Sequence, residues 1–261
     1  ELKSRTGADI CILDSSPVEY EHTRLKEGQR IEFGAVRMEV VATPGHTPHS
    51  LSLLVSDLMR AEAPWMILTG DLLFVGAVGR PDLAGAEVLD EQVKNLYTSL
   101  YEKVGSLPDY LEVYPAHGQG SLCGKGLSSK TSSTLGYERR TQSALQYPDF
   151  ETFRKDMSGE FPVRPKSFTH IIETNRKGPP LLERCPLERA LNPDRFKEFW
   201  ERKATIIDTR DAGAFGGFHV PGSINIGFEK QMANWIGMVV DPLADILLVV
   251  DDKEKYEQMT V

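Results

Sequence analysis

Three short motifs place a side chain that can bind a metal ion directly after a predicted strand. They are T-P-G-H-T-P-H-S at 43–50, T-G-D-L-L-F at 69–74 and Y-P-A-H-G at 114–118. A strand fixes the direction of the chain, and the Pro or Gly turn that follows lets a side chain project beyond the sheet edge. We therefore predict that His46, Asp71 and His117 converge on one metal centre.

The donor set of this predicted centre is imidazole nitrogen and carboxylate oxygen. Such donors suit Zn(II), Mn(II) or Fe(II), and two histidines with one carboxylate on a single face leave positions open for a substrate and dioxygen. Spacing alone does not decide the metal. Any one of these histidines taken alone is more often a hydrogen-bonded loop residue than a ligand, so the prediction depends on three motifs occurring together.

The elements that must position these motifs are visible as alternating or wholly apolar segments. We predict strands at 10–13, 31–33, 36–42, 50–55, 66–68 and 111–114, in a largely antiparallel sheet. The apolar spacing from Val88 to Val104 predicts an amphipathic helix. Further helical patterns lie at 137–145 and 150–157. Strands followed by interspersed helices predict a layered α/β domain.

The order of the motifs T-P-G-H-T, G-D and P-x-H-G closely resembles that of the metallo-β-lactamase superfamily. The resemblance covers roughly residues 1–175 and implies an αββα sandwich with metal bound at one sheet edge. The stretch L-F-V-G-A-V-G-R-P-D-L at 73–83 is similar to the G-R-x-D stretch of persulfide dioxygenases and related glyoxalase-II-type enzymes. This similarity implies Fe(II), with Zn(II) as the alternative, and a low-molecular-weight thiol persulfide such as glutathione persulfide as substrate.

Arg80 within that stretch is the candidate substrate-binding residue. A guanidinium fork can hold a carboxylate of a thiol such as glutathione through paired, charge-assisted hydrogen bonds. The alternative is a structural ion pair with Asp82 or another loop carboxylate.

The sequence departs from the family pattern in one respect, because the family's upstream H-x-H-x-D-H motif does not occur in it. The resemblance implies that iron is held by a histidine of that motif together with residues matching His46 and Asp71. His117 matches the second-metal histidine of the dinuclear hydrolases. We expect the remaining ligand to precede Glu1, and predict that these 261 residues do not assemble the complete family site.

Cys123 is the candidate catalytic thiol. It lies in G-Q-G-S-L-C-G-K-G at 118–126, on a loop that should pass near the metal, where Lys125 or the metal could favour the thiolate. Such a thiolate could accept or exchange sulfane sulfur. The alternative is a small buried thiol that stabilises the loop. Cys11 and Cys185 carry no such signal, and three widely spaced cysteines do not predict a disulfide framework.

A change of composition between residues 178 and 193 predicts two domains, because P-P, C-P and N-P dipeptides interrupt regular structure there. We predict a metallo-β-lactamase-like domain over 1–185, without its H-x-H-x-D-H part, and a small parallel α/β domain over 193–261. The segment 204–226 resembles the opening of a rhodanese domain: a strand, D-x-R, a short helix and a G-x-H-x-P-G-S turn.

The rhodanese resemblance implies a cysteine after the strand Ile246–Val250, but Asp251 and Asp252 follow it. A carboxylate cannot accept sulfane sulfur, so we predict a non-catalytic, structural or docking unit. Asp208, Arg210 and His219 would then maintain its fold.

Composition excludes several classes of protein. Lys plus Arg number 30 and Asp plus Glu 38, giving a net charge of −8 that disfavours a nucleic-acid partner. Hydrophobic residues make up 40% and charged residues 26%, as in globular proteins. No apolar run is long enough to span a membrane. We predict a soluble, cytoplasmic protein without a membrane or nucleic-acid partner, and a homodimer is compatible with the sequence.

The resulting hypothesis is a non-haem iron persulfide dioxygenase-type enzyme that oxidises a thiol persulfide to sulfite and thiol. One alternative is a glyoxalase-II-like thioester hydrolase, in which Asp71 bridges two metals. The other is a catalytically incomplete scaffold fragment.

Overall fold

The computed structural model describes residues 2–121, 123–124, 126–159, 167–181, 190–229 and 231–258. The chain divides into two compact units. The larger unit comprises Ala8–Pro17 and Glu21–Pro162, and the smaller unit comprises Glu1–Gly7, Val18–Tyr20 and Val163–Val261. Part of the junction predicted over 178–193 lies outside the described residues, and Cys185 is in that part.

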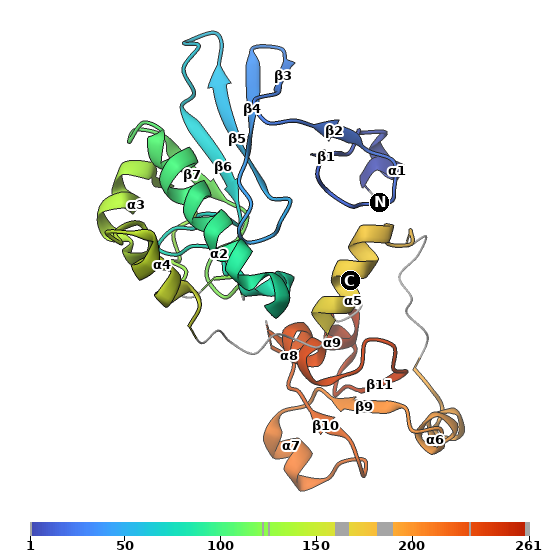
Figure 1. The fold of residues 1–261 in the computed structure, drawn as a ribbon. Coiled ribbons are helices and arrows are strands. Elements are labelled where there is room, and N and C mark those ends of the chain that lie inside the picture. The colour runs from blue at the N-terminus through green and yellow to red at the C-terminus, as the bar shows by residue number, and fades with distance from the viewer. Residues whose placement is uncertain are drawn as a thin grey trace. The chain divides into compact units, whose positions relative to one another are not determined.

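A six-stranded sheet with the order β3-β4-β5-β6-β7-β8 forms the centre of the larger unit (Figure 1). Its strands are β3 (Arg30–Phe33), β4 (Val36–Ala42), β5 (Leu51–Asp57), β6 (Met66–Gly70), β7 (Glu112–Pro115) and β8 (Ser133–Thr134). Only the β6–β7 pair is parallel, and the other four pairs are antiparallel, which confirms the predicted, largely antiparallel sheet. The prediction was wrong for the strand 10–13, which lies in a separate parallel pair.

Helices cover one face of this sheet. They are α2 (Leu89–Tyr97), a π-helical turn (Thr98–Lys103), α3 (Leu135–Thr141) and α4 (Phe150–Met157), with short 3-10 turns at Asp82–Ala84, Ala86–Val88, Val104–Ser106 and Ser143–Leu145. Helices α2 and α4 lie side by side (Figure 1), and Phe153 of α4 packs edge-on against Tyr97 and Tyr101. Phe153, Ile67 and Val113 are completely buried in this core, so the helix layer and the sheet share one apolar interior.

The predicted helix over 88–104 is α-helical only as far as Tyr97. The next residues form the π-helical turn, in which Ser99 is buried and its hydroxyl donates to the Pro44 carbonyl oxygen at 2.7 Å. This bond ties the turn to the chain that follows β4. The apolar spacing predicted the buried face correctly, but it did not predict the change of helical pitch.

A two-stranded parallel sheet, β1 (Cys11–Leu13) with β2 (Thr23–Leu25), packs against the six-stranded sheet. Leu13 and Leu25 contact the buried Val40 of β4. Each strand has three residues, so the pair buries little. The αββα sandwich expected from the sequence is therefore seen only in part: the described residues contain one large sheet with one helix layer, not two of each.

The smaller unit contains a three-stranded parallel sheet with the order β10-β9-β11. Its elements are α1 (Leu2–Thr6), α5 (Ser167–Lys177), α6 (Pro193–Glu201), β9 (Thr205–Asp208), α7 (Ala212–Gly217), β10 (Ile224–Asn225), α8 (Met232–Val239), β11 (Ile246–Val249) and α9 (Lys253–Gln258). Ile207, Ile226 and Val240 form its buried core. The predicted parallel α/β arrangement is confirmed, whereas its rhodanese-like identity stays a prediction.

Asp208 and Arg210 are joined by a paired hydrogen bond at the end of β9. The Arg210 guanidinium donates to both carboxylate oxygens of Asp208, at 2.9 and 2.6 Å, and to the Phe218 carbonyl oxygen at 2.8 Å. The His219 ring stacks on Phe215 with the ring centroids 4.1 Å apart. Within the described ranges, every helix is too short or too polar to cross a lipid bilayer.

Candidate metal centre

The His46 loop joins β4 to β5 and is held from both sides. The Thr43 side chain is buried and its hydroxyl lies 3.0 Å from that of Ser52. Gly45 has φ +147°, and a Cβ at this position would lie 2.6 Å from the Leu96 Cα. Only glycine allows the loop to approach α2 this closely. The T-P-G-H sequence therefore fixes the backbone that carries His46.

The His46 imidazole is 5% exposed and faces two neighbours. Its Nδ1 lies 3.0 Å from the Arg80 carbonyl oxygen, and its Nε2 lies 3.6 Å from Oδ2 of Asp71. A carbonyl oxygen can only accept, so Nδ1 carries the proton and the neutral ring presents an Nε2 lone pair toward Asp71. Burial lowers the pKa of His46 and so favours this neutral form, although the Asp71 carboxylate acts in the opposite direction.

Asp71 and His117 reach the same edge because β6 and β7 run parallel. Gly70 pairs with Pro115 at the ends of these strands, and the Ala116 amide donates to the Gly70 carbonyl oxygen at 2.9 Å. His117 Nδ1 consequently donates to Oδ1 of Asp71 at 2.5 Å. Strand β4 also runs parallel to β6, since both are antiparallel to β5, so all three ligand-bearing loops leave one edge of the sheet.

A hairpin after Asp71 brings the Arg80 carbonyl group to His46. The Gly79 amide donates to the Leu72 carbonyl oxygen at 3.1 Å. The hairpin tip is held where the Gly76 amide donates to the buried carboxylate of Glu138 at 2.9 Å. These bonds set the position of the Arg80 carbonyl group that orients His46.

The Arg80 side chain itself is 4% exposed and forms a bidentate salt bridge with Asp82. Its guanidinium donates to both oxygens of Asp82, at 2.8 and 2.6 Å. This is the structural arrangement that the sequence left open beside substrate binding. Direct binding of a substrate carboxylate by Arg80 stays a prediction, and it would require the guanidinium to exchange Asp82 for the substrate.

Cys123 lies at the same centre. One ligand atom each from His46, Asp71 and Cys123 lie within 4.8 Å of one another. Burial raises the pKa of the Cys123 thiol, and the nearby Asp71 carboxylate acts in the same direction. Without a cation the sulfur is therefore a thiol. Lys125, which we considered as a group that favours the thiolate, lies outside the described residues.

The donors present fit a divalent transition-metal ion. An imidazole nitrogen, a carboxylate oxygen and a sulfur within 4.8 Å of one another are a donor set found for zinc and iron. The lone pairs of His46 Nε2 and Asp71 Oδ2 face each other, and a cation between them would stabilise this arrangement. His117 is outside this three-atom group and is 45% exposed. Its role as a ligand stays a prediction, since its observed contact is with the Asp71 carboxylate.

The sequence analysis gave the ion pair of Arg80 with Asp82 as one alternative, but it did not identify the packing role of Gly79. A Cβ at Gly79 would lie 1.9 Å from the Asp71 carbonyl oxygen and 3.0 Å from the His46 ring. The R-P-D spacing and the glycine before it were the available signals.

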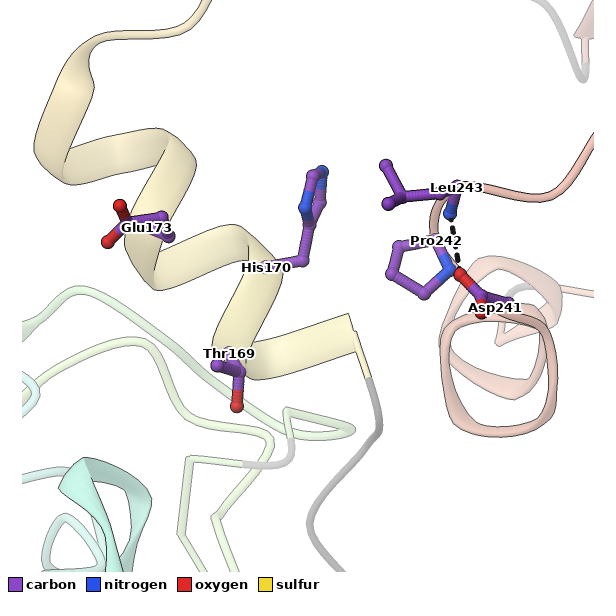
Figure 2. A pocket seen from close by; sticks show the side chains of 6 residues that line it. All are labelled: Thr169, His170, Glu173, Asp241, Pro242 and Leu243. Atoms are coloured by element: carbon purple, nitrogen blue, oxygen red, sulfur yellow. Dashed lines mark hydrogen bonds between the residues drawn. The ribbon is translucent and has the colours of Figure 1, made fainter.

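The smaller unit has a pocket of about 520 Å³ lined by α5 and the segment after α8. Its lining residues are Thr169, His170, Glu173, Asp241, Pro242 and Leu243. Figure 2 shows the His170 ring pointing from α5 toward Pro242 and Leu243. None of the predicted site residues lines this pocket.

Known proteins resemble the chain in sequence and in fold. No family model matches it. A metallo-β-lactamase from Staphylococcus aureus subsp. aureus COL matches with a TM-score of 0.84 and 29% identity, covering 99% of this chain and 74% of that chain. The human persulfide dioxygenase ETHE1, a mitochondrial protein, is 34% identical over 153 residues. The comparisons support membership of the metallo-β-lactamase superfamily.

The metallo-β-lactamase relatives differ in how much of their length is matched. The human ETHE1 alignment covers 59% of this chain and 52% of the relative. ETHE1 from Myxococcus xanthus matches with a TM-score of 0.55 and 27% identity, covering 67% of this chain and 68% of that chain. The chain spans about half the length of the curated relatives that it matches. These relatives include enzymes, and together with the donor cluster they point to a metal cofactor.

Proposed function

We propose that the protein to which this chain belongs is a metal-dependent persulfide dioxygenase. It would convert a thiol persulfide, one O2 and one water into the thiol and sulfite, with two protons released to solvent. The observation that carries this proposal is the convergence of His46 and Asp71 on one point at the sheet edge. The 34% identity to human persulfide dioxygenase ETHE1 supports the reaction class.

The metal ion of this proposal is Fe(II), with Zn(II) as the alternative. Bound iron would supply open positions for the sulfane sulfur and for dioxygen. His46 would hold it through Nε2, which the bond between Nδ1 and the Arg80 carbonyl oxygen orients. Asp71 would hold it through Oδ2, while His117 donates to Oδ1 and fixes the carboxylate plane.

The proposed substrate is a low-molecular-weight thiol persulfide such as glutathione persulfide. Arg80 is the proposed anchor for its carboxylate, provided that the guanidinium releases Asp82. Cys123 is the proposed thiol that exchanges sulfur with the substrate, because its sulfur lies beside the two metal-binding side chains.

A second candidate is a dinuclear thioester hydrolase, and one observation favours it. The two oxygens of Asp71 face different histidines, with His117 at Oδ1 and His46 at Oδ2. A carboxylate placed in this way could bridge two cations, one on each histidine.

Oxygen consumption distinguishes the two reactions. The iron-loaded protein should consume O2 and release sulfite when given glutathione persulfide, and His46→Ala and Asp71→Asn should each lose activity by more than the roughly 10–100-fold typical of losing an outer partner of a metal ligand. His170→Ala, on the exposed surface of α5, is the control and should retain activity. Cleavage of a glutathione thioester without oxygen, and no oxygen uptake with the persulfide, would replace the dioxygenase by the hydrolase.

A further inference from the structure

The π-helical turn Thr98–Lys103 is bonded to the loop that carries His46, and the proposed reaction gives this turn no role. Ser99 in the turn is completely buried, and its hydroxyl donates to the Pro44 carbonyl oxygen at 2.7 Å. We propose that Ser99 is a positioning residue of the metal centre, acting on His46 through the Pro44 peptide group. The inference rests on the metal-dependent function proposed above, and it adds to that function a side chain that binds neither metal nor substrate.

A second donor of the same turn holds the residue at the end of β4. The Lys103 ammonium group donates to the Ala42 carbonyl oxygen at 2.7 Å and to the Glu27 carboxylate at 3.2 Å. The same carboxylate oxygen accepts from the Ala42 amide at 2.6 Å. One ion pair therefore binds both backbone polar groups of Ala42, just before the loop that carries His46.

The loop also touches the helix directly. Gly45 passes so close to α2 that a Cβ there would lie 2.6 Å from the Leu96 Cα. Leu96, Ser99 and Lys103 are three and four residues apart, so they lie along one side of the helical segment. That side contacts the chain at three points immediately before His46.

The helical pitch of this segment is unusual. The Val104 amide donates to the Ser99 carbonyl oxygen, five residues back, whereas an α-helix would pair it with the residue four back. Turns of this π-helical kind are rare and are frequently found at functional sites. Here the turn presents a hydroxyl and an ammonium group to the chain that leads to His46, and a positioning role accounts for the irregularity.

The position of His46 matters because its ring contacts two groups from other segments. Its Nδ1 lies 3.0 Å from the Arg80 carbonyl oxygen, and its Nε2 lies 3.6 Å from Oδ2 of Asp71. Functional constellations need their side chains held to within about 0.5 Å. Ser99→Ala replaces the donor to the Pro44 carbonyl oxygen with a methyl group, and an acceptor deprived of its hydrogen bond is unfavourable. The loop should then shift and move His46 out of line with both contacts.

Zinc titration of the full 261-residue chain tests the proposal. Ser99→Ala should bind Zn(II) at least about tenfold more weakly than the parent, the loss typical of removing an outer partner of a metal ligand. Tyr101→Phe is the matched control, because it removes a hydroxyl of the same turn that donates to the Ala144 carbonyl oxygen at 3.0 Å instead of to the His46 loop. This control should retain the zinc affinity of the parent.

Nuclear magnetic resonance of the metal-free protein separates positioning from a general loss of stability. At about pH 8 the neutral His46 ring should show two well-separated ring-nitrogen resonances, one for the protonated Nδ1 and one for the bare Nε2. In Ser99→Ala these resonances should move toward each other, because a ring that has lost its contact with Arg80 exchanges between tautomers. Tyr101→Phe should keep the resonances of the parent.

Lys103→Met provides a second variant if Ser99→Ala does not fold. The Lys103 side chain is 34% exposed, so this substitution removes the bond to Ala42 without altering a completely buried position. It should weaken zinc binding and move the His46 resonances in the same direction as Ser99→Ala. Lys94→Met, at an exposed position of α2, is its control and should do neither.

The outcomes separate this inference from the proposed function. Zinc affinity and His46 resonances that stay unchanged in every folded variant of Ser99 and Lys103 overturn the positioning role and leave the metal-dependent function standing. A parent protein that binds no zinc overturns the proposed function, and the His46 resonances of the metal-free variants still decide the positioning role.

Discussion

Gly79 lies where the hairpin passes between two ligand-bearing segments, and it offers a sharp test of the packing around the centre. A Cβ at this position would lie 1.9 Å from the Asp71 carbonyl oxygen and 3.0 Å from Cβ and Nδ1 of His46. The nearest obstruction is a backbone atom, so Gly79→Ala requires the hairpin and the Asp71 segment to separate by about an ångström. Overpacking of this kind costs about 1–3 kcal/mol, and we expect the upper end of that range.

The same displacement would move Asp71 relative to His46, so Zn(II) affinity should also fall by at least about tenfold. Urea unfolding followed by circular dichroism and Zn(II) titration measure the two effects. Gly118→Ala is the matched control, because a Cβ there would meet no atom within 4 Å, and it should change stability by less than about 0.5 kcal/mol. A Gly79→Ala protein with the stability and zinc affinity of the parent would refute this packing.

Three further substitutions test other parts of the structure. Phe153→Ala should destabilise the larger unit by about 3–5 kcal/mol in urea unfolding, because the ring is completely buried. Asp82→Ala should cost about 3 kcal/mol, since it leaves the nearly buried Arg80 guanidinium without its paired carboxylate. The side chain of Arg210 holds the pKa of Asp208 below its ordinary value, so this pair should stabilise the fold above about pH 4 and lose that contribution as the pH falls through the lowered pKa. Asp208→Asn should remove that part of the acid sensitivity in thermal unfolding at a series of pH values.

The controls for these substitutions are other residues of the same chain. Phe33→Ala should change stability by less than about 0.5 kcal/mol, because that ring is 53% exposed. Arg60→Ala serves as the control for Asp82→Ala, since the Arg60 side chain is 88% exposed and its ion pair with Asp57 contributes little. An equal loss in a substitution and its control would contradict the burial or pairing assigned here. For Asp208, an unchanged acid dependence in the asparagine variant would do so.

The regular spacing of apolar residues along the sequence made the strands and several helices predictable. The predicted strand 36–42 coincides with β4, and 150–157 coincides with α4, whose N-cap Asp149 accepts from the Thr152 amide. Asn192 caps α6, with its side chain accepting from the Arg195 amide. These features depend on local sequence, because the spacing of apolar residues and the capping side chains involve residues only a few positions apart.

Features that depend on distant residues were not predictable. Strand β2 has three residues, only the last of which is buried, so no period identifies it. The contact between Arg80 and Asp82 is local and was named from the sequence, but the sequence did not decide between this ion pair and substrate binding. The sequence predicted that the Cys123 loop passes near the metal centre, but no local pattern encodes the bridge between Gly79 and Gly124 that holds it there.

The central claim is that His46 and Asp71 bind the same cation. Anomalous diffraction from a crystal soaked in Zn(II) tests it most directly. We predict one peak about 2.0–2.2 Å from both Nε2 of His46 and Oδ2 of Asp71. A peak bound to only one of these atoms, or zinc found solely elsewhere on the chain, would contradict it.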